Sequence, residues 1–146
     1  MPDRPSVMFV CVKNGGKSQL AAGLMSKIAG DLIDVYSAGT EPGAEVNGLS
    51  AQALAEVGVD ISREQTKPID RALLASMTAV VTLGLEAAVD PVVGPRFERW
   101  DTDEPSDRGI DGIERMRLIR DDIAARVAIL RTRLLEDRPG SSVPLR

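Results

Sequence analysis

The sequence predicts an α/β fold, a three-layer sandwich in which helices cover both faces of a four-stranded parallel sheet. Short apolar segments alternate with helical ones along the chain, which is the order of parallel strands joined by helical crossovers. The strand segments are apolar rather than strictly alternating, as in strands buried on both faces. The chain has 146 residues, the size of one domain. We expect that domain to span residues 1–136 and residues 137–146 to form a disordered tail.

The first predicted strand and helix flank a loop that contains two glycines. Residues 7–11 (VMFVC) are apolar and predict a buried strand. An asparagine and two glycines interrupt this pattern in residues 12–17. Residues 18–30 predict a helix, because apolar residues recur at four-residue spacing and Gly30 stops the pattern. Ser18 is expected to cap this helix or to lie in its first turn.

Three shorter elements follow. Residues 32–37 (LIDVYS) alternate and predict the second strand. Residues 49–58 predict a short helix that ends at a glycine, with Ser50 as its N-cap. Residues 69–77 predict another helix, with Asp70 near its start.

The last elements complete the sheet and add a long helix. Residues 79–83 (AVVTL) predict a third buried strand, and residues 97–100 (FERW) a short fourth strand. Residues 111–136 predict a helix whose apolar stripe, at spacings of three and four, packs on the core. Ligands of parallel sheets bind beyond the carboxyl ends of the strands. The loop at residues 11–18 is therefore the first candidate site.

The composition excludes several kinds of chemistry. The chain has no histidine and one cysteine, Cys11. This excludes Ser-His-Asp triads, His-ligated zinc, Fe–S clusters and an intramolecular disulfide, and we expect no metal. The net charge of −4 argues against nucleic-acid binding. The longest apolar run, Val7 to Val12, has six residues, whereas a membrane span needs roughly 20. The N-terminus is too polar for a signal peptide. We therefore expect the chain to be cytoplasmic and to have no membrane partner.

The loop after the first strand has the composition of an oxyanion-binding site. A glycine-rich turn that enters a helix exposes backbone N–H groups and the positive end of the helix dipole. The asparagine and the two glycines permit left-handed backbone conformations that direct several amides to one point. The two lysines add positive charge. After Cys11, this predicted oxyanion-binding loop comprises Val12, Lys13, Asn14, Gly15, Gly16, Lys17 and Ser18.

Cys11 lies at the base of this loop. The helix N-terminus, the amides and the cations favour the thiolate over the thiol. A thiolate below an oxyanion is a nucleophile directed at the central atom of that oxyanion. Ser18 can hydrogen-bond the thiolate, and the side-chain amide of Asn14 can hold the shape of the loop. The alternative is a small buried hydrophobic residue, which a lone cysteine after a strand usually is.

A second alternative is a nucleotide-binding loop. Gly16, Lys17 and Ser18 match the end of the pattern G-x-x-x-x-G-K-[ST]. Cys11 stands where that pattern has its first glycine, and no predicted strand ends in an aspartate for magnesium. We therefore favour thiol chemistry over nucleotide hydrolysis.

A thiolate attack also needs an acid that protonates the departing oxygen. The segment 100–105 (WDTDEP) offers three carboxylates in a loop that ends at a proline. A solvated turn is the alternative interpretation. The acid role requires the fold to bring residues 101–105 over the loop at 11–18.

The run VMFVCVKNGGKSQLAA (residues 7–22) resembles the phosphate-loop signature of the low-molecular-weight protein tyrosine phosphatases and the arsenate reductases that share their fold. That signature is Cys, five residues, Arg, then Ser or Thr. Ser-Ala-Gly-Thr at 37–40 and the acidic turn at 103–105 extend the resemblance, which covers about residues 6–135. Gln19 and the alanines after it are similar to the arsenate-reductase branch. The resemblance implies a flavodoxin-like architecture.

By position, the resemblance implies roles for individual residues. Cys11 would be the nucleophile, and Lys17 takes the place of the oxyanion-binding arginine. Glu104 takes the place of the general-acid aspartate, with the adjacent Asp103 as the alternative. Lysine replaces a bidentate fork by a point charge, and glutamate is one methylene longer than aspartate. Support of the loop falls to Asn14, Ser18 and Ser37.

The single cysteine selects among arsenate reductases. Those that reduce arsenate through their own thiol relay need two further cysteines, which this chain lacks. The pattern Cys-x-x-Asn-Gly-Gly-Lys-Ser resembles the single-cysteine arsenate–mycothiol transferases, in which the lysine form belongs to working enzymes. This implies arsenate detoxification, with no bound cofactor and with mycothiol or another low-molecular-weight thiol as co-substrate. A glutaredoxin-like redox protein would complete the reduction.

Two other functions stay open. The first is a low-molecular-weight phosphatase, in which water resolves the phosphocysteine. The poverty in aromatic residues counts against a phosphotyrosine pocket, although Trp100 could supply one wall. The second is a catalytically weak oxyanion-binding or interaction protein, in which Lys17 and Glu104 have replaced the arginine and the aspartate that efficient catalysis requires.

Overall fold

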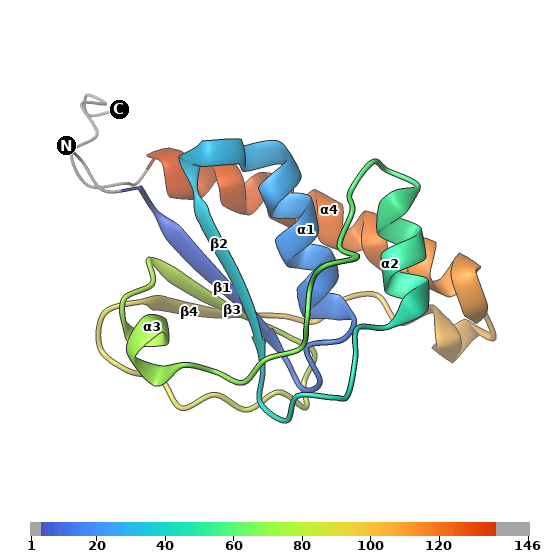
Figure 1. The fold of residues 1–146 in the computed structure, drawn as a ribbon, viewed down its shortest axis with the longest axis horizontal. Helices are drawn as coiled ribbons and strands as arrows, with labels where there is room; N and C mark the ends of the chain where they lie inside the picture. The colour runs from blue at the N-terminus through green and yellow to red at the C-terminus, as the bar shows by residue number, and fades with distance from the viewer. Residues whose placement is uncertain (1–3, 137–146) are drawn as a thin grey trace.

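A four-stranded parallel sheet forms the centre of the molecule (Figure 1), as the sequence predicts. The structure, a computed structural model, describes residues 4–136. The predicted tail at 137–146 lies outside the described residues. The elements in chain order are β1 (Ser6–Cys11), α1 (Lys17–Ala29), the 3₁₀ turn η1 (Gly30–Leu32), β2 (Asp34–Gly39), α2 (Gly48–Ala55), α3 (Arg71–Ala75), β3 (Ala79–Leu83), β4 (Arg96–Trp100), the 3₁₀ turn η2 (Pro105–Arg108) and α4 (Gly112–Glu136).

The strand order makes β1 and β3 the two central strands of the sheet. The order is β2-β1-β3-β4, and every neighbouring pair is parallel. The carboxyl ends of the strands therefore meet at one edge. At that edge Cys11, the last residue of β1, is opposite Gly39, the last residue of β2.

Helices α1, α2 and α4 cover one face of the sheet, and α3 lies on the other face (Figure 1). Val7 and Phe9 of β1 face the larger helical layer, whereas Met8 and Val10 face α3. The apolar stripe of α4 is buried in the larger core cluster, which confirms its predicted place. Its buried residues are Met116, Ile119, Ile123, Val127, Leu130 and Leu134.

Several predicted boundaries differ from the structure. Helix α2 ends at Ala55 rather than at residue 58, and α3 spans Arg71–Ala75 rather than 69–77. Strand β2 begins at Asp34 instead of residue 32, because residues Gly30–Leu32 form a 3₁₀ turn first. Asn47, not Ser50, caps α2, and its side chain accepts a hydrogen bond from the Ser50 amide at 3.0 Å. Asparagine is as good a cap as serine, and it stands three residues earlier.

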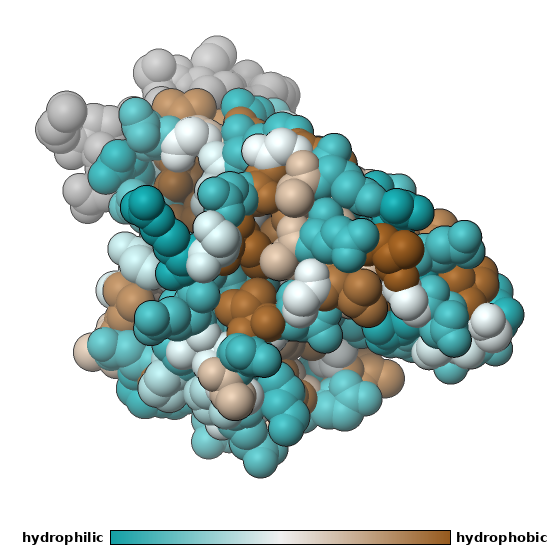
Figure 2. Space-filling model, turned by 45° about the vertical axis from the view of Figure 1, so that its right-hand side comes forward, coloured by the Kyte–Doolittle hydropathy of each residue, from teal (hydrophilic) through white to brown (hydrophobic). Residues whose placement is uncertain are grey.

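The surface is mixed. Hydrophilic residues cover most of the face drawn in Figure 2, with apolar residues in small groups between them. Within residues 4–136, no helix is both long enough and apolar enough to cross a membrane. The same residues contain no group of three or more acidic or cysteine side chains placed to hold a metal ion.

Candidate active site

The base of the loop is a buried chain of hydrogen bonds. The sulfur of Cys11 lies 2.9 Å from the Ser18 hydroxyl, and the side-chain amide of Asn14 donates to that hydroxyl at 2.7 Å. Asn14 and Ser18 are fully buried, and Cys11 is 8% exposed. Because the Ser18 oxygen accepts from Asn14, its own hydrogen is available to the sulfur. This arrangement stabilises negative charge on the sulfur.

Asn14 determines the path of the loop. Its φ is 55°, and it is the only non-glycine residue with positive φ in the described part of the chain. Its Oδ1 accepts from the Lys67 amide at 3.0 Å, which holds this left-handed conformation. The side chain therefore has the shaping contacts that the sequence suggested.

Of the three residues that permit a left-handed conformation, Asn14 adopts one and the two glycines do not. Neither Gly15 nor Gly16 has a positive φ. Gly15 is closely packed instead, because a Cβ there would make a tight contact of 3.2 Å with the Glu45 carbonyl oxygen. Its own carbonyl accepts from the Asn47 amide at 2.7 Å. Gly16 is the N-cap of α1, with φ −130° and ψ −93°.

A lysine from a distant segment supports the loop, and no motif in the sequence indicated it. The ammonium of Lys67 donates to the Gln65 carbonyl at 2.8 Å, to Ser37 Oγ at 3.2 Å and to Asn14 Oδ1 at 3.5 Å. Burial lowers the pKa of Lys67, and the charge of Glu64 opposes that shift. Ser37 thus contacts the predicted support network through Lys67.

Two further residues hold the loop. Gln19, which the sequence offered only as a family marker, is buried, and its side-chain amide donates to the Asn14 carbonyl at 3.0 Å. Gly39 on the neighbouring strand lies so close that a Cβ there would be 2.7 Å from the Val12 carbonyl oxygen. The same Cβ would be 3.0 Å from the Asn14 backbone nitrogen, so only glycine fits.

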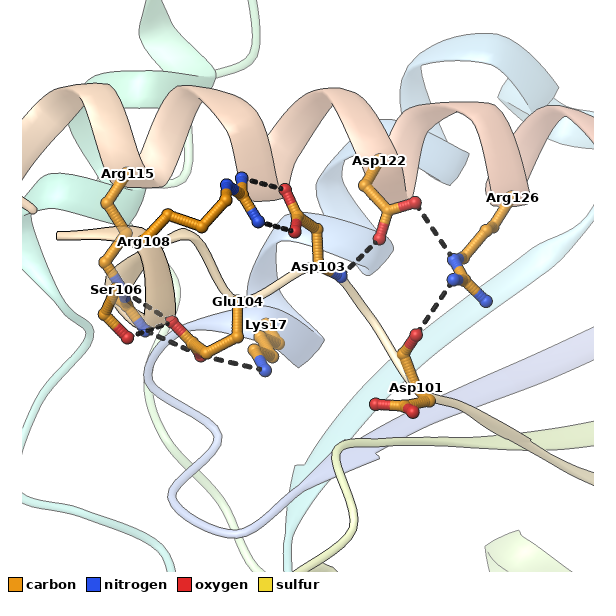
Figure 3. Close-up of polar contacts among 9 residues, drawn as sticks. All are labelled: Lys17, Asp101, Asp103, Glu104, Ser106, Arg108, Arg115, Asp122 and Arg126. Carbon is orange, nitrogen blue, oxygen red and sulfur yellow. Dashed lines mark hydrogen bonds and ion pairs between the residues drawn. The ribbon is translucent and has the colours of Figure 1, made fainter. Parts of the chain in front are cut away.

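The fold brings the predicted acidic turn to the open side of the loop (Figure 3). Glu104 Oε1 lies 3.6 Å from the ammonium of Lys17, the first residue of α1. Arg115, in the first turns of α4, donates to both oxygens of Glu104, at 2.8 and 3.0 Å. Ser106 Oγ is 2.8 Å from Glu104 Oε2. Arg115 and Ser106 are site residues that sequence reasoning missed.

These contacts affect the expected general acid. The hydrogen bonds from Arg115, then those from Ser106 and the charges of Arg115 and Lys17, outweigh burial and lower the pKa of Glu104 to about 2. Asp103, the alternative acid, accepts two hydrogen bonds from Arg108, which lower its pKa as well. Both carboxyls are ionised at neutral pH, so this arrangement does not supply the proton that the predicted role needs.

Trp100 does not line the site. It is 5% exposed, and its ring centroid lies 5.7 Å from that of Phe9 in the core. Its indole N–H donates to Glu98 at 2.8 Å. The expectation that Trp100 could form an aromatic wall beside the acidic turn is wrong, because this side chain packs into the core between the sheet and the helices.

A pocket adjoins the loop on the side of the 43–48 segment. It encloses about 560 Å³ and shares Lys13, Gly15 and Gly16 with the loop. The opposite wall is backbone-rich, since residues 43–48 (GAEVNG) include two glycines and an alanine.

The chain belongs to the low molecular weight phosphotyrosine protein phosphatase family, whose pattern matches residues 6–139. Its relatives in that family include proteins named arsenate reductase. It is 34% identical over 134 residues to arsenate reductase 2 of Staphylococcus haemolyticus, covering 90% of this chain and 99% of the relative. It is 38% identical over 127 residues to an arsenate reductase of Halalkalibacterium halodurans, covering 83% and 91%.

Solved structures agree with this placement. An arsenate reductase in the phosphate binding state superimposes with a TM-score of 0.78 and 29% identity, covering 89% of this chain and 98% of that one. The thioredoxin-dependent arsenate reductase Cg_ArsC1′ of Corynebacterium glutamicum superimposes with a TM-score of 0.76 and 31% identity. That match covers 90% of this chain but 62% of the other.

Proposed function

We propose that this protein is an arsenate reductase of the arsenate–mycothiol transferase type, which acts in arsenate detoxification in the cytosol. The observation that carries the proposal is a single thiol at the base of an oxyanion-binding loop. The relatives named arsenate reductase, one of them solved in a phosphate binding state, support an oxyanion of this class as substrate.

The first step is attack by the Cys11 thiolate on arsenate held in the loop at 11–18. An S–As bond forms, and one As–O bond breaks. The departing oxygen takes a proton from solvent and leaves as water, and arsenic stays in the pentavalent state. The hydrogen bond of Ser18 to the sulfur stabilises the thiolate before the attack.

The second step frees the enzyme. An external thiol attacks arsenic, a new S–As bond forms, and Cys11 leaves as the thiolate. The pocket of about 560 Å³ beside the loop offers room for a low-molecular-weight thiol such as mycothiol. Reduction of the arsenic–thiol product then falls to a separate redox protein of the glutaredoxin-like class.

The cysteine count supports an external thiol. An enzyme that reduces arsenate within one chain must form a disulfide between its own cysteines, and this chain has only Cys11. One turnover would otherwise leave arsenic on Cys11.

The test is mass spectrometry of the protein with arsenate, with and without mycothiol, and with Cys11→Ser as the control. We expect an arsenic–mycothiol adduct that forms catalytically and only with Cys11 present. Turnover by the Cys11→Ser variant contradicts the mechanism. Turnover with thioredoxin and its reductase in place of mycothiol contradicts the transferase type.

Phosphatase activity is the second candidate, since the matching family bears that name. The same loop and cysteine would serve, and water would resolve the phosphocysteine. The burial of Trp100 removes the aromatic wall that would favour phosphotyrosine. Hydrolysis of an aryl phosphate, without an arsenic adduct, would favour this candidate. Neither activity in a folded protein would favour an oxyanion-binding or interaction protein.

A further inference from the structure

The carboxylate of Glu104 bridges two cations, Lys17 and Arg115, on the open side of the loop (Figure 3). We call these three residues the mouth of the loop. Glu104 Oε1 is 3.6 Å from Lys17 Nζ and 3.0 Å from Arg115 Nη2. Glu104 Oε2 is 2.8 Å from Arg115 Nε. The two cations come from different helices, and a single oxygen contacts both. A carboxylate is itself an oxyanion, so its place between Lys17 and Arg115 marks where a second oxyanion group can bind.

Arg115 has the geometry that position 17 lacks. The Lys17 ammonium is a point charge, whereas a guanidinium presents two parallel N–H groups to two oxygens of one anion. Arg115 already uses such a pair of N–H groups on Glu104. Phosphate and arsenate oxygens match the same fork. The side chains of Lys17 and Arg115 are 25% and 30% exposed, so solutes can reach both.

We infer that Arg115 is a second oxyanion-binding residue, which Glu104 holds at the mouth of the loop until arsenate or phosphate replaces its carboxylate between Lys17 and Arg115. This inference rests on the proposed function and names how that site takes its substrate. In the free protein, the Glu104 carboxylate occupies the position of the anion.

The exchange also changes Glu104. The charged groups that face it are Lys17 from α1 and Arg115 from α4, with Asp103 beside it in its own turn. Asp103 is itself paired with Arg108. When the cations move to the substrate, Glu104 keeps only Ser106, and its pKa rises from about 2 toward its ordinary value of 4.5. Substrate binding therefore weakens the preference of Glu104 for its ionised form.

The test is titration calorimetry with inorganic phosphate on the full chain. We expect Arg115→Gln to weaken phosphate binding by about tenfold or more, the effect of losing charge-assisted hydrogen bonds. Arg115→Lys should recover part of the loss. Arg117→Gln is the matched control, because Arg117 lies on the same helix and pairs with Glu56. It should bind phosphate like the wild type.

A double variant separates direct binding from an effect through Glu104. Glu104→Gln should bind phosphate more tightly than the wild type, since the competing carboxylate is gone. Adding Arg115→Gln in that background should still weaken binding. If Arg115→Gln has no effect in the Glu104→Gln background, Arg115 only positions Glu104, and the inference is wrong. Failure of the wild type to bind phosphate at all would instead overturn the proposed function, and this inference with it.

Discussion

The base and the mouth of the loop differ in burial and in charge. At the base, Cys11, Ser18 and Asn14 are buried and joined by hydrogen bonds of 2.7–2.9 Å. At the mouth, the charged Lys17 and Glu104 are 25% and 31% exposed and 3.6 Å apart. Buried hydrogen bonds are costly to break, whereas exposed ion pairs exchange partners at little cost. The base is therefore suited to fixing a nucleophile, and the mouth to admitting an anion.

The largest expected effect comes from breaking the base at Asn14. Asn14→Ala places alanine in a left-handed conformation and leaves the Lys67 amide without its acceptor. We expect the free energy of unfolding to fall by about 3 kcal/mol and arsenate turnover to fall by at least tenfold. Urea unfolding and the arsenate assay measure the two effects.

Asn14→Gly is the control for conformation. Glycine accepts the positive φ and loses only the side-chain contacts. It should be more stable than Asn14→Ala but equally slow in turnover. Full activity in Asn14→Gly would show that the side chain is not needed at the base.

Ser18→Ala should slow the reaction of the Cys11 thiol without unfolding the protein. It removes the hydroxyl 2.9 Å from the sulfur and leaves the backbone of α1 unchanged. We expect the rate of Cys11 alkylation by iodoacetamide at neutral pH to fall roughly tenfold, the value of one hydrogen bond to a charged group. Ser26→Ala, on the same helix, should alkylate like the wild type. An unchanged rate in Ser18→Ala would exclude the hydroxyl as a support of the thiolate.

Lys17→Arg probes the mouth by adding a second guanidinium fork. If the geometry at position 17 sets substrate choice, hydrolysis of an aryl phosphate should rise by a few-fold. The measurement is kcat/KM with p-nitrophenyl phosphate, and Lys27→Arg is the control on the same helix. No change, or a fall, would remove this explanation of the lysine.

The smallest expected effect is an acid dependence of stability at the mouth. The pKa of Glu104 is about 2 in the folded state against 4.5 ordinarily. Its ion pair therefore stabilises the fold fully above pH 4.5, and the contribution disappears as the pH falls through about 2. Urea unfolding should show the wild type more stable than Glu104→Gln at pH 5, with a narrower gap at pH 3.

Glu56→Gln is the control for that measurement. The pKa of Glu56 is also about 2, lowered chiefly by its hydrogen bonds to Arg117 and Arg120. Its acid dependence should be similar, but phosphate binding should stay unchanged. A constant gap for Glu104→Gln between pH 5 and pH 3 would contradict the pairing at the mouth.

The sequence predicted the base of the site better than its surroundings. The run at 7–11 and the glycines after it are local signals, so the strand, the turn and the place of Cys11 follow from neighbouring residues. The long helix followed equally from its periodicity. By contrast, η1 moved the start of β2, because a single 3₁₀ turn leaves no periodic pattern.

The missed residues reach the site through tertiary structure. Lys67 contacts Asn14 from a position 53 residues along the chain, and Arg115 contacts Glu104 from the start of α4. Neither position carries a motif. The pairing of Glu104 with two cations depends on how α1 and α4 pack, so the sequence offered an acid where the structure has a bridged carboxylate.

Gly39 sets a condition for anyone who would transplant this site. Its missing side chain leaves room for the Val12 carbonyl and the Asn14 amide, which a Cβ would meet at 2.7 and 3.0 Å. The eight residues from Cys11 to Ser18 would therefore not keep this conformation if they were grafted alone onto another protein. A host scaffold would have to supply, on the strand beside the graft, a residue without a side chain at the matching register.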